Sequence, residues 1–148
     1  MEDLRELYQE VILDHNKNPK NFRKLENASH TSEGYNPFCG DRINLYLQIE
    51  DDHIKDISFE GSGCAISKAS SSVMTGELKG KTLAEAKKLF KKFQGIITGK
   101  TEADFTGLDK LSVFAGVREF PVRVKCAALA WHNMLEAIEN GTEKISTE

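Results

Sequence analysis

The sequence predicts an α+β domain: a small antiparallel sheet of about three strands, with helices packed over one face. Apolar and polar residues alternate over residues 43–49, the pattern of a half-buried strand. After residue 65, apolar residues recur mainly at helical spacing. Strands therefore come early and helices late, instead of alternating along the chain. The 148 residues suit a single domain that spans residues 1–148.

The first half of the chain is predicted to contain one helix and a β-hairpin. Apolar residues of the N-terminal segment recur at helical spacing, and this helix is expected to end near His15, before a turn-rich stretch. The hairpin follows from two apolar-alternating runs separated by Asp-Asp-His, and a weaker pattern predicts a third strand. These strands and the turn are expected at residues 28–35, 43–49, 51–53 and 54–59.

In the second half, three helices are predicted to begin at residues 65, 82 and 121. The first stops before Gly80, and Pro121 suits the opening turn of the last, because proline lacks the N–H that is unpaired there. The last helix is expected to reach Asn140, where Gly141 provides a C-terminal cap. Residues 98–107 are expected to form a loop and residues 108–117 one or two helical turns.

Composition excludes several classes of function. The net charge of −3 gives no basic footprint, so we expect no nucleic-acid partner. No apolar run approaches the roughly 18 residues that cross a bilayer, so we expect no membrane association. The N-terminus predicts an acidic helix and not a targeting segment, which favours a cytoplasmic protein. Only three cysteines are present, and an odd number argues against a disulfide framework.

The three cysteines lie where predicted elements begin or end. Cys39 precedes the first clear strand, Cys64 precedes a helix, and Cys126 lies in the first turns of the last helix. Glycines beside them permit sharp bends, so Asp41, two residues after Cys39, can face the same point. Unpaired N–H groups at a helix N-terminus favour thiolate over thiol. Scaffold-held element ends are where ligands usually gather.

Three thiolates and a carboxylate make a four-ligand tetrahedral site that suits zinc or an iron–sulfur unit. Four negative ligands exceed the charge of a divalent metal, and three neighbouring cations are expected to offset the excess: Arg42, Arg123 and Lys125. The aspartate is expected to make such a site exchangeable, since a hard oxygen binds a soft centre less firmly. Spacing alone leaves a second interpretation open, because scattered cysteines without a CxxC pair are often buried small hydrophobes.

Other reactive side chains have simpler interpretations. His15 is expected to cap carbonyls or pack locally, His53 to be solvated in the hairpin turn, and His132 to pack or lie at the surface. A cluster of serines resembles a nucleophile group, but no histidine–carboxylate partner is evident, and small residues for close helix packing explain it better. It comprises Ser67, Ser70, Ser71 and Ser72. The lysines at 87, 88, 91 and 92 are expected to form a solvated helix face, with a docking patch for an acidic partner as the alternative.

Three cysteine-containing blocks resemble the IscU/NifU-N superfamily of iron–sulfur cluster assembly proteins, and most closely its SufU branch. They are Asn36-Pro37-Phe38-Cys39-Gly40-Asp41-Arg42, Gly61-Ser62-Gly63-Cys64-Ala65-Ile66-Ser67 and Phe120-Pro121-Val122-Arg123-Val124-Lys125-Cys126 with the apolar run to Trp131. Residues 12–19 are similar as well. Two features differ from IscU proper: Lys125 stands where IscU-type scaffolds have histidine, and residues 94–114 include extra sequence. The IscU chaperone-recognition motif is also replaced, by residues 120–123.

The resemblance implies an α+β fold and a tetrahedral zinc held by Cys39, Asp41, Cys64 and Cys126. It also implies a sulfurtransferase-like carrier more than a conventional enzyme, with a PLP-dependent cysteine desulfurase of the SufS type as its partner. Cys39 is the expected persulfide acceptor, assisted by Asp41, Arg123 and Lys125. The alternative that it implies is a scaffold for a transient [2Fe–2S] cluster or iron on the three cysteines, passed on to assembly or acceptor proteins. A purely structural zinc is a further alternative.

Overall fold

The computed structural model describes residues 2–37, 40–99, 109–140 and 144–146, and it has the α+β architecture that the sequence predicts. A four-stranded sheet has the order β3-β2-β1-β4. The first three strands are antiparallel neighbours, β1 (His30–Asn36), β2 (Asp41–Glu50) and β3 (His53–Ser62). The short β4 (Lys144–Ser146) pairs parallel with β1 and was not predicted.

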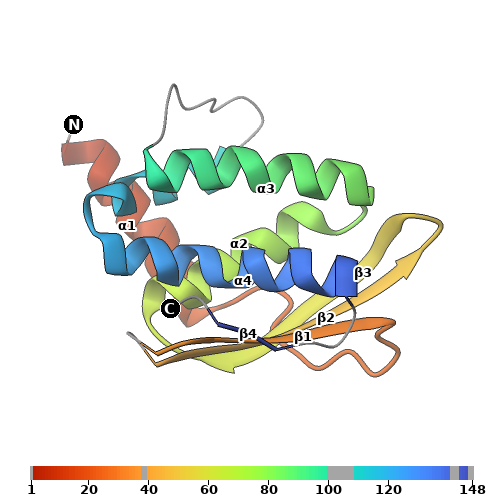
Figure 1. Ribbon diagram of the computed structural model, residues 1–148. Coiled ribbons are helices and arrows are strands. Elements are labelled where there is room, and N and C mark those ends of the chain that lie inside the picture. Colours follow the sequence, from red (N-terminus) through yellow and green to blue (C-terminus); the bar gives the residue numbers. More distant parts are fainter. Residues whose placement is uncertain (1, 38–39, 100–108, 141–143, 147–148) are drawn as a thin grey trace.

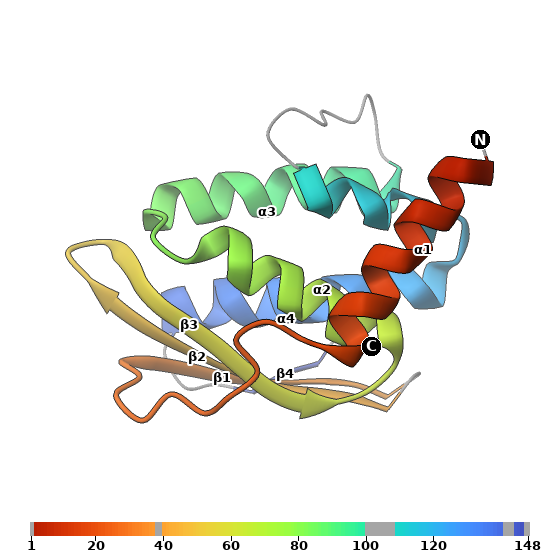
Figure 2. The same cartoon turned by 180° about the vertical axis from the view of Figure 1, so that it is seen from behind.

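The helices lie over one face of this sheet (Figure 1). They are α1 (Glu2–Lys17), α2 (Ala65–Leu78), α3 (Leu83–Thr98), the 3-10 helix η1 (Asp109–Glu119) and α4 (Pro121–Asn140). Figures 1 and 2 show α2 and α4 between the sheet and α3. The predicted starts of α2 and α4 are confirmed, and Thr82 caps α3 through a capping box with Glu85. The predicted loop at 98–107 and the Gly141 cap lie largely outside the described residues.

The predicted hairpin forms because its turn accepts left-handed backbone. Asp51 and Asp52, between β2 and β3, have φ values of 50° and 60°. A two-residue hairpin turn of the primed type requires positive φ at both central positions, and aspartate tolerates this conformation better than most residues. The main chain of Ile54 is then linked to the α2–α3 connection by hydrogen bonds with Gly80 and Lys81.

Strand alternation decides which residues of β2 face the helices. Ile43, Leu45 and Leu47 each have at most 1% of their surface exposed to solvent, and they form the part of the core that the sheet contributes. Asp41, the first residue of β2, lies an even number of positions from these residues, so its side chain points to the same face. It is also fully buried. The core row of β2 thus ends in a carboxylate.

Strand β1 presents small and polar residues to the same face: Ser32, Gly34 and Asn36. A Cβ at Gly34 would collide with the side-chain amide of Asn133, on α4. The Nδ2 of Asn133 donates to the Ile43 carbonyl at 3.0 Å. The Asn133 side chain therefore packs directly on Gly34 and links the middle of α4 to β2.

The serines of α2 serve packing, as the sequence indicates. All four are buried, and Ser70 joins α2 to α4: its hydroxyl donates to the Ala127 carbonyl at 2.6 Å and accepts from Trp131 Nε1 at 3.2 Å. Trp131 is fully buried and stacks on Phe93 with 4.6 Å between ring centroids. One polar bridge therefore fixes how α2 and α4 approach each other in the core.

Helix α1 is joined to α2 by a buried imidazole. The sequence suggested a local role for His15, but its Nδ1 lies 2.7 Å from the hydroxyl of Ser72, 57 residues away. The Lys20 backbone N–H also donates to that hydroxyl, at 2.7 Å.

Among the described helices, none combines the length and the apolar character needed to cross a membrane.

Replacing Ser70 by alanine is expected to lower the free energy of unfolding by about 2 kcal/mol, because a buried indole N–H and a buried hydroxyl contact are lost together. Urea denaturation measures this change. Ser71→Ala is the matched control: Ser71 is equally buried, but its hydroxyl donates to the Ser67 carbonyl within α2, at 2.9 Å. Its expected loss is about 0.5 kcal/mol or less, because alanine favours the helix. Equal losses in the two variants would contradict the bridging role of Ser70.

Candidate metal centre

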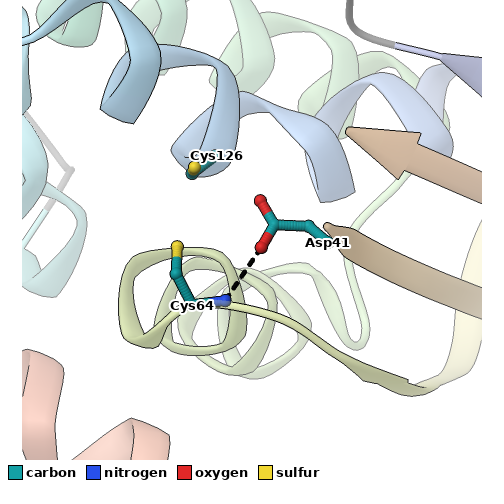
Figure 3. Close-up of side chains that lie close together, drawn as sticks. All are labelled: Asp41, Cys64 and Cys126. Atoms are coloured by element: carbon teal, nitrogen blue, oxygen red, sulfur yellow. Dashed lines mark hydrogen bonds between the residues drawn. The ribbon is translucent and has the colours of Figure 1, made fainter. Parts of the chain in front are cut away.

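Three of the four predicted ligands meet at one point. Asp41 begins β2, Cys64 is the N-cap of α2, and Cys126 lies in the second turn of α4. One ligand atom from each lies within 4.8 Å of the others, and the side chains point toward one another (Figure 3). The fourth predicted ligand, Cys39, lies outside the described residues. It is two positions before Asp41, in the segment that joins β1 to β2.

The backbone conformation of two glycines, which other residues rarely adopt, places Cys64 at the site. Gly61 and Gly63, at the end of β3 and just after it, have φ values of 148° and 155°. A Cβ at Gly63 would collide with the Asp41 carboxylate and lie 3.0 Å from the Asp41 Cα. The chain can therefore pass against Asp41 only because residue 63 has no side chain.

The position of Cys64 at the start of α2 places its sulfur among backbone donors. Its backbone is extended, and its Sγ accepts a hydrogen bond from the Ser67 N–H at 3.4 Å, as an N-cap side chain does. The positive end of the helix dipole favours negative charge at this position. The local fold therefore stabilises a thiolate at residue 64.

Asp41 is fully buried, and each of its carboxylate oxygens has a protein donor. The Cys64 backbone N–H donates to Oδ1 at 2.8 Å, the bond drawn in Figure 3. The Asn36 amide donates to Oδ2 at 3.2 Å. Burial of an ionised carboxylate is tolerated only with such partners, so these bonds keep Asp41 in place and available as an anionic ligand.

Asn36 is the residue of the site that sequence reasoning missed. It is fully buried, and its Nδ2 also lies 3.5 Å from the Cys126 Sγ, within hydrogen-bonding distance for sulfur. It is paired with Asp41 on the neighbouring strand of the sheet. The sequence did contain a pattern that could have indicated Asn36. Asn36 and Asp41 flank the β1–β2 connection, and residues paired on neighbouring strands point to the same face of the sheet.

The two cysteines influence each other's protonation. A hydrogen bond from the Cys126 thiol is the largest influence on Cys64, and it lowers the pKa of Cys64 to about 6, although burial opposes the change. The Ser67 N–H lowers the pKa further, and the negative charge of Asp41 raises it. The lowered pKa favours the thiolate form of Cys64 at neutral pH.

The donor set fits a small soft cation. Two thiol sulfurs and one carboxylate oxygen are ligands that tetrahedral zinc accepts, and ligand sulfurs around zinc lie about 3.8 Å apart, given bonds of about 2.3 Å. The observed separations of at most 4.8 Å are therefore within a small side-chain adjustment of that geometry. The described residues supply three candidate ligands, and the fourth predicted ligand, Cys39, lies outside them.

The predicted cationic neighbours lie in different places. Arg42 does not face the site, so this expectation was wrong: its guanidinium lies 4.9 Å from the ring centroid of Tyr35, on the opposite face of the sheet from Asp41. Arg123 is exposed and Lys125 half-buried in the opening turns of α4, just before Cys126, and both make further contacts. Arg123 and Lys125 are three residues and one residue before Cys126 on the same helix.

The histidines that the structure describes do not join this group of ligands. His132 is half-buried and packs edge-on against Phe90, with 5.3 Å between ring centroids, and burial lowers its pKa. His53 is exposed at the start of β3, with Nδ1 at 2.8 Å from the Asp51 carbonyl. The packing and solvated roles expected for these two are confirmed.

Comparison with known proteins shows the family of this chain. The family described as "NifU-like N terminal domain" matches residues 7–148. A protein named zinc-dependent sulfurtransferase SufU, from Bacillus subtilis, is 42% identical over 142 residues, which cover 96% of this chain and 93% of the relative. A protein from Thermotoga maritima, named iron–sulfur cluster assembly scaffold protein IscU, is 40% identical over 134 residues, 90% of this chain and 93% of the relative.

Solved structures show the same fold. A crystal structure from Fervidobacterium islandicum, described as that of a candidate iron–sulfur cluster assembly scaffold protein for the SUF system, superposes with a TM-score of 0.84 at 41% identity, covering 88% of this chain and 95% of that one. The N-terminal part of a nitrogen-fixing NifU-like protein from Brucella abortus superposes with a TM-score of 0.81. At 23% identity, over 88% of this chain and 91% of the other, this second match speaks for the fold alone.

Replacing Gly63 by alanine is expected to weaken zinc binding by about tenfold or more, because the new Cβ displaces the Asp41 carboxylate from its position. Competition with a chromophoric chelator measures the affinity. Gly76→Ala is the control, since a Cβ at this α2 position meets no atom within 4 Å. The control is expected to keep its zinc affinity and to gain about 0.5–1 kcal/mol of stability. Unchanged zinc affinity in the Gly63 variant would contradict the proposed packing against Asp41.

In the metal-free protein, alkylation of Cys64 is expected to rise with pH through a midpoint near 6, because the thiolate is the reactive form and its pKa is lowered to about 6. The measurement uses a Cys39→Ser background, with alkylation at residue 64 followed by mass spectrometry. Adding Cys126→Ala removes the main stabilising hydrogen bond, so the midpoint moves upward. The urea-unfolded chain is the control and titrates near the ordinary thiol value of about 8.5. A folded-state midpoint equal to the unfolded one would contradict the coupling of the two thiols.

Proposed function

Because this chain belongs to the family of NifU-like N-terminal domains, we propose that it accepts sulfur from a cysteine desulfurase and delivers it for iron–sulfur cluster biosynthesis, with zinc as its resident metal. The observation that carries the proposal is the convergence of Asp41, Cys64 and Cys126, three ligands from three separate elements. The relative named as a zinc-dependent sulfurtransferase supports it, since the similarity covers nearly the whole of both chains.

We assign the metal to Cys39, Asp41, Cys64 and Cys126. When bound, zinc would hold the thiols in their deprotonated form at neutral pH. The chain itself contributes the conditions for this: the helix N-terminus at Cys64, the lowered pKa of the Cys64 thiol, and the two N–H groups on Asp41. A protein built only for stability would gain more from a fourth thiolate than from a carboxylate.

In the proposed reaction, the Cys39 thiolate attacks the outer sulfur of a persulfide on the desulfurase. A new S–S bond forms at Cys39, the S–S bond of the desulfurase persulfide breaks, and its cysteine leaves as a thiolate that takes up a proton. One sulfane sulfur moves, and the two proteins together are neither oxidised nor reduced. Cys39 is suited to this role because it lies two residues before Asp41 in the sequence, between β1 and β2.

Two cations of α4 are proposed to assist this step. Arg123 and Lys125 precede Cys126, and a positive charge beside the ligands favours the thiolate state of an attacking sulfur.

The exposed apolar residues near these two cations fit a protein partner. Phe120 directly precedes α4 and Val122 lies in its first turn, and Phe120 is 59% exposed. Aromatic side chains of this kind are enriched at protein interfaces.

The second candidate function is a scaffold that builds a [2Fe–2S] cluster on the same cysteines and passes it to acceptor proteins. The relative named as an iron–sulfur cluster assembly scaffold favours it. Anaerobic reconstitution with iron and sulfide separates the two functions. A stable and transferable cluster chromophore supports the scaffold, whereas stimulation of a desulfurase that depends on bound zinc supports the sulfur acceptor.

Cys39→Ser is expected to abolish sulfur acceptance, because a hydroxyl cannot take the sulfane sulfur. The zinc-loaded chain is mixed with a PLP-dependent cysteine desulfurase and cysteine, and persulfides are trapped by alkylation and located by mass spectrometry. Desulfurase turnover is expected to fall to the level seen without the chain, while the Ser71→Ala control accepts sulfur as the unmodified chain does. Normal acceptance by the Cys39 variant would show that the role is assigned to the wrong residue. If Asp41→Ala lowers only the melting temperature and leaves desulfurase stimulation intact, the zinc is structural.

A further inference from the structure

One buried amide contacts two of the candidate ligands at once. The Nδ2 of Asn36 lies 3.2 Å from Asp41 Oδ2 and 3.5 Å from Cys126 Sγ. Asn36 and Asp41 are fully buried, as is Cys126. The two ligands come from a strand and from a helix that begins 80 residues later, so Asn36 bridges parts of the chain that have no covalent reason to remain together.

The orientation of this amide follows from its partners. An ionised carboxylate only accepts hydrogen bonds, and a cysteine sulfur accepts them through its lone pairs whether or not it carries a proton. The amide nitrogen carries two N–H groups, enough for one bond to each ligand, whereas the amide oxygen would repel both. The Nδ2 must therefore face the ligand pair, as it does.

The backbone fixes the position of the amide. Asn36 and Asp41 are directly paired residues at the end of the β1–β2 ladder, and both point toward the helices. Because the backbone pairing sets the distance between them, the Asn36 side chain needs little further ordering to reach Asp41. Helix α4 then brings Cys126 to the other N–H of the same amide.

From this geometry we infer that Asn36 is a positioning residue for the metal centre: it holds Asp41 and Cys126 in place for the ion and reduces the repulsion between their negative charges. The inference rests on the proposed zinc site and goes beyond the ligand assignment. A neutral donor suits the position, since a buried lysine or arginine would carry a larger desolvation cost. Outer residues that orient metal ligands commonly change metal affinity by 10–100-fold when they are replaced.

Asn36→Ala and Asn36→Asp provide the test. Alanine removes both N–H groups, and aspartate keeps the shape but places an acceptor against two anions. Zinc transfer from the loaded protein to a chromophoric chelator is expected to accelerate by about tenfold or more in both variants, with aspartate the faster. In the cobalt-substituted protein, the thiolate-to-cobalt charge-transfer band is expected at lower energy in the alanine variant. A sulfur that has lost an N–H donor holds its electrons less tightly.

Asn133→Ala is the matched control. Asn133 is also a fully buried asparagine on the inner side of β1 and β2, but its Nδ2 donates to the Ile43 carbonyl and not to a ligand. The control is expected to lose thermal stability while keeping its zinc release rate within about twofold and its cobalt spectrum unchanged. Because a destabilised fold alone does not move that band, the spectrum separates positioning from general structural support.

Several outcomes overturn the inference. It fails if the Asn36 variants release zinc and absorb light as the unmodified protein does, if Asn133→Ala matches them in both readouts, or if the unmodified chain binds no zinc. Failure of the proposed function is a separate result: zinc retention then follows the expected order across the variants, but the zinc-loaded chain takes no sulfur from the desulfurase.

Discussion

The site depends on one hydrogen bond, from the Cys64 backbone N–H to Asp41 Oδ1 at 2.8 Å. This bond joins the end of the sheet to the start of α2, and it forms because Gly63 leaves room for the carboxylate. It also makes the burial of Asp41 tolerable, since an ionised carboxylate without donors would be strongly disfavoured in the core. The arrangement of strand, helix start and glycine is therefore a single structural unit, and each part needs the other two.

The same unit explains how a core can end in a reactive centre. The inner row of β2 is apolar at Ile43, Leu45 and Leu47 and becomes anionic at Asp41. Two helices begin or run past that point, and their N-terminal parts present N–H groups instead of carbonyls. The apolar layer of the protein therefore meets its polar centre at the end of β2 that carries Asp41.

Much of this could be predicted from the sequence, for physical reasons that differ by element. The β2–β3 hairpin and α2 have strong local patterns, so their place along the chain is confirmed. Strand β4 has three residues and pairs with a strand more than 100 positions earlier, so no local pattern could indicate it. Arg42 was misplaced because adjacency to Asp41 was treated as proximity, whereas neighbours in a strand face opposite sides. Asn36 was missed because its role depends on cross-strand pairing and on helix α4, neither of which spacing alone specifies.

The hydrogen bonds of Asp41 bear on how a carboxylate would behave among thiolates in the proposed metal site. Each oxygen of Asp41 accepts one N–H and retains a lone pair for a metal. These N–H groups make the carboxylate oxygens weaker ligands for a metal. They also remain hydrogen-bonded to the carboxylate if it dissociates from the ion. Detachment therefore leaves no buried charge without partners, which would otherwise oppose it by several kcal/mol. A thiolate in that position would bind more tightly, so in the proposed site the aspartate would favour exchange of the ion or of another ligand over permanent retention.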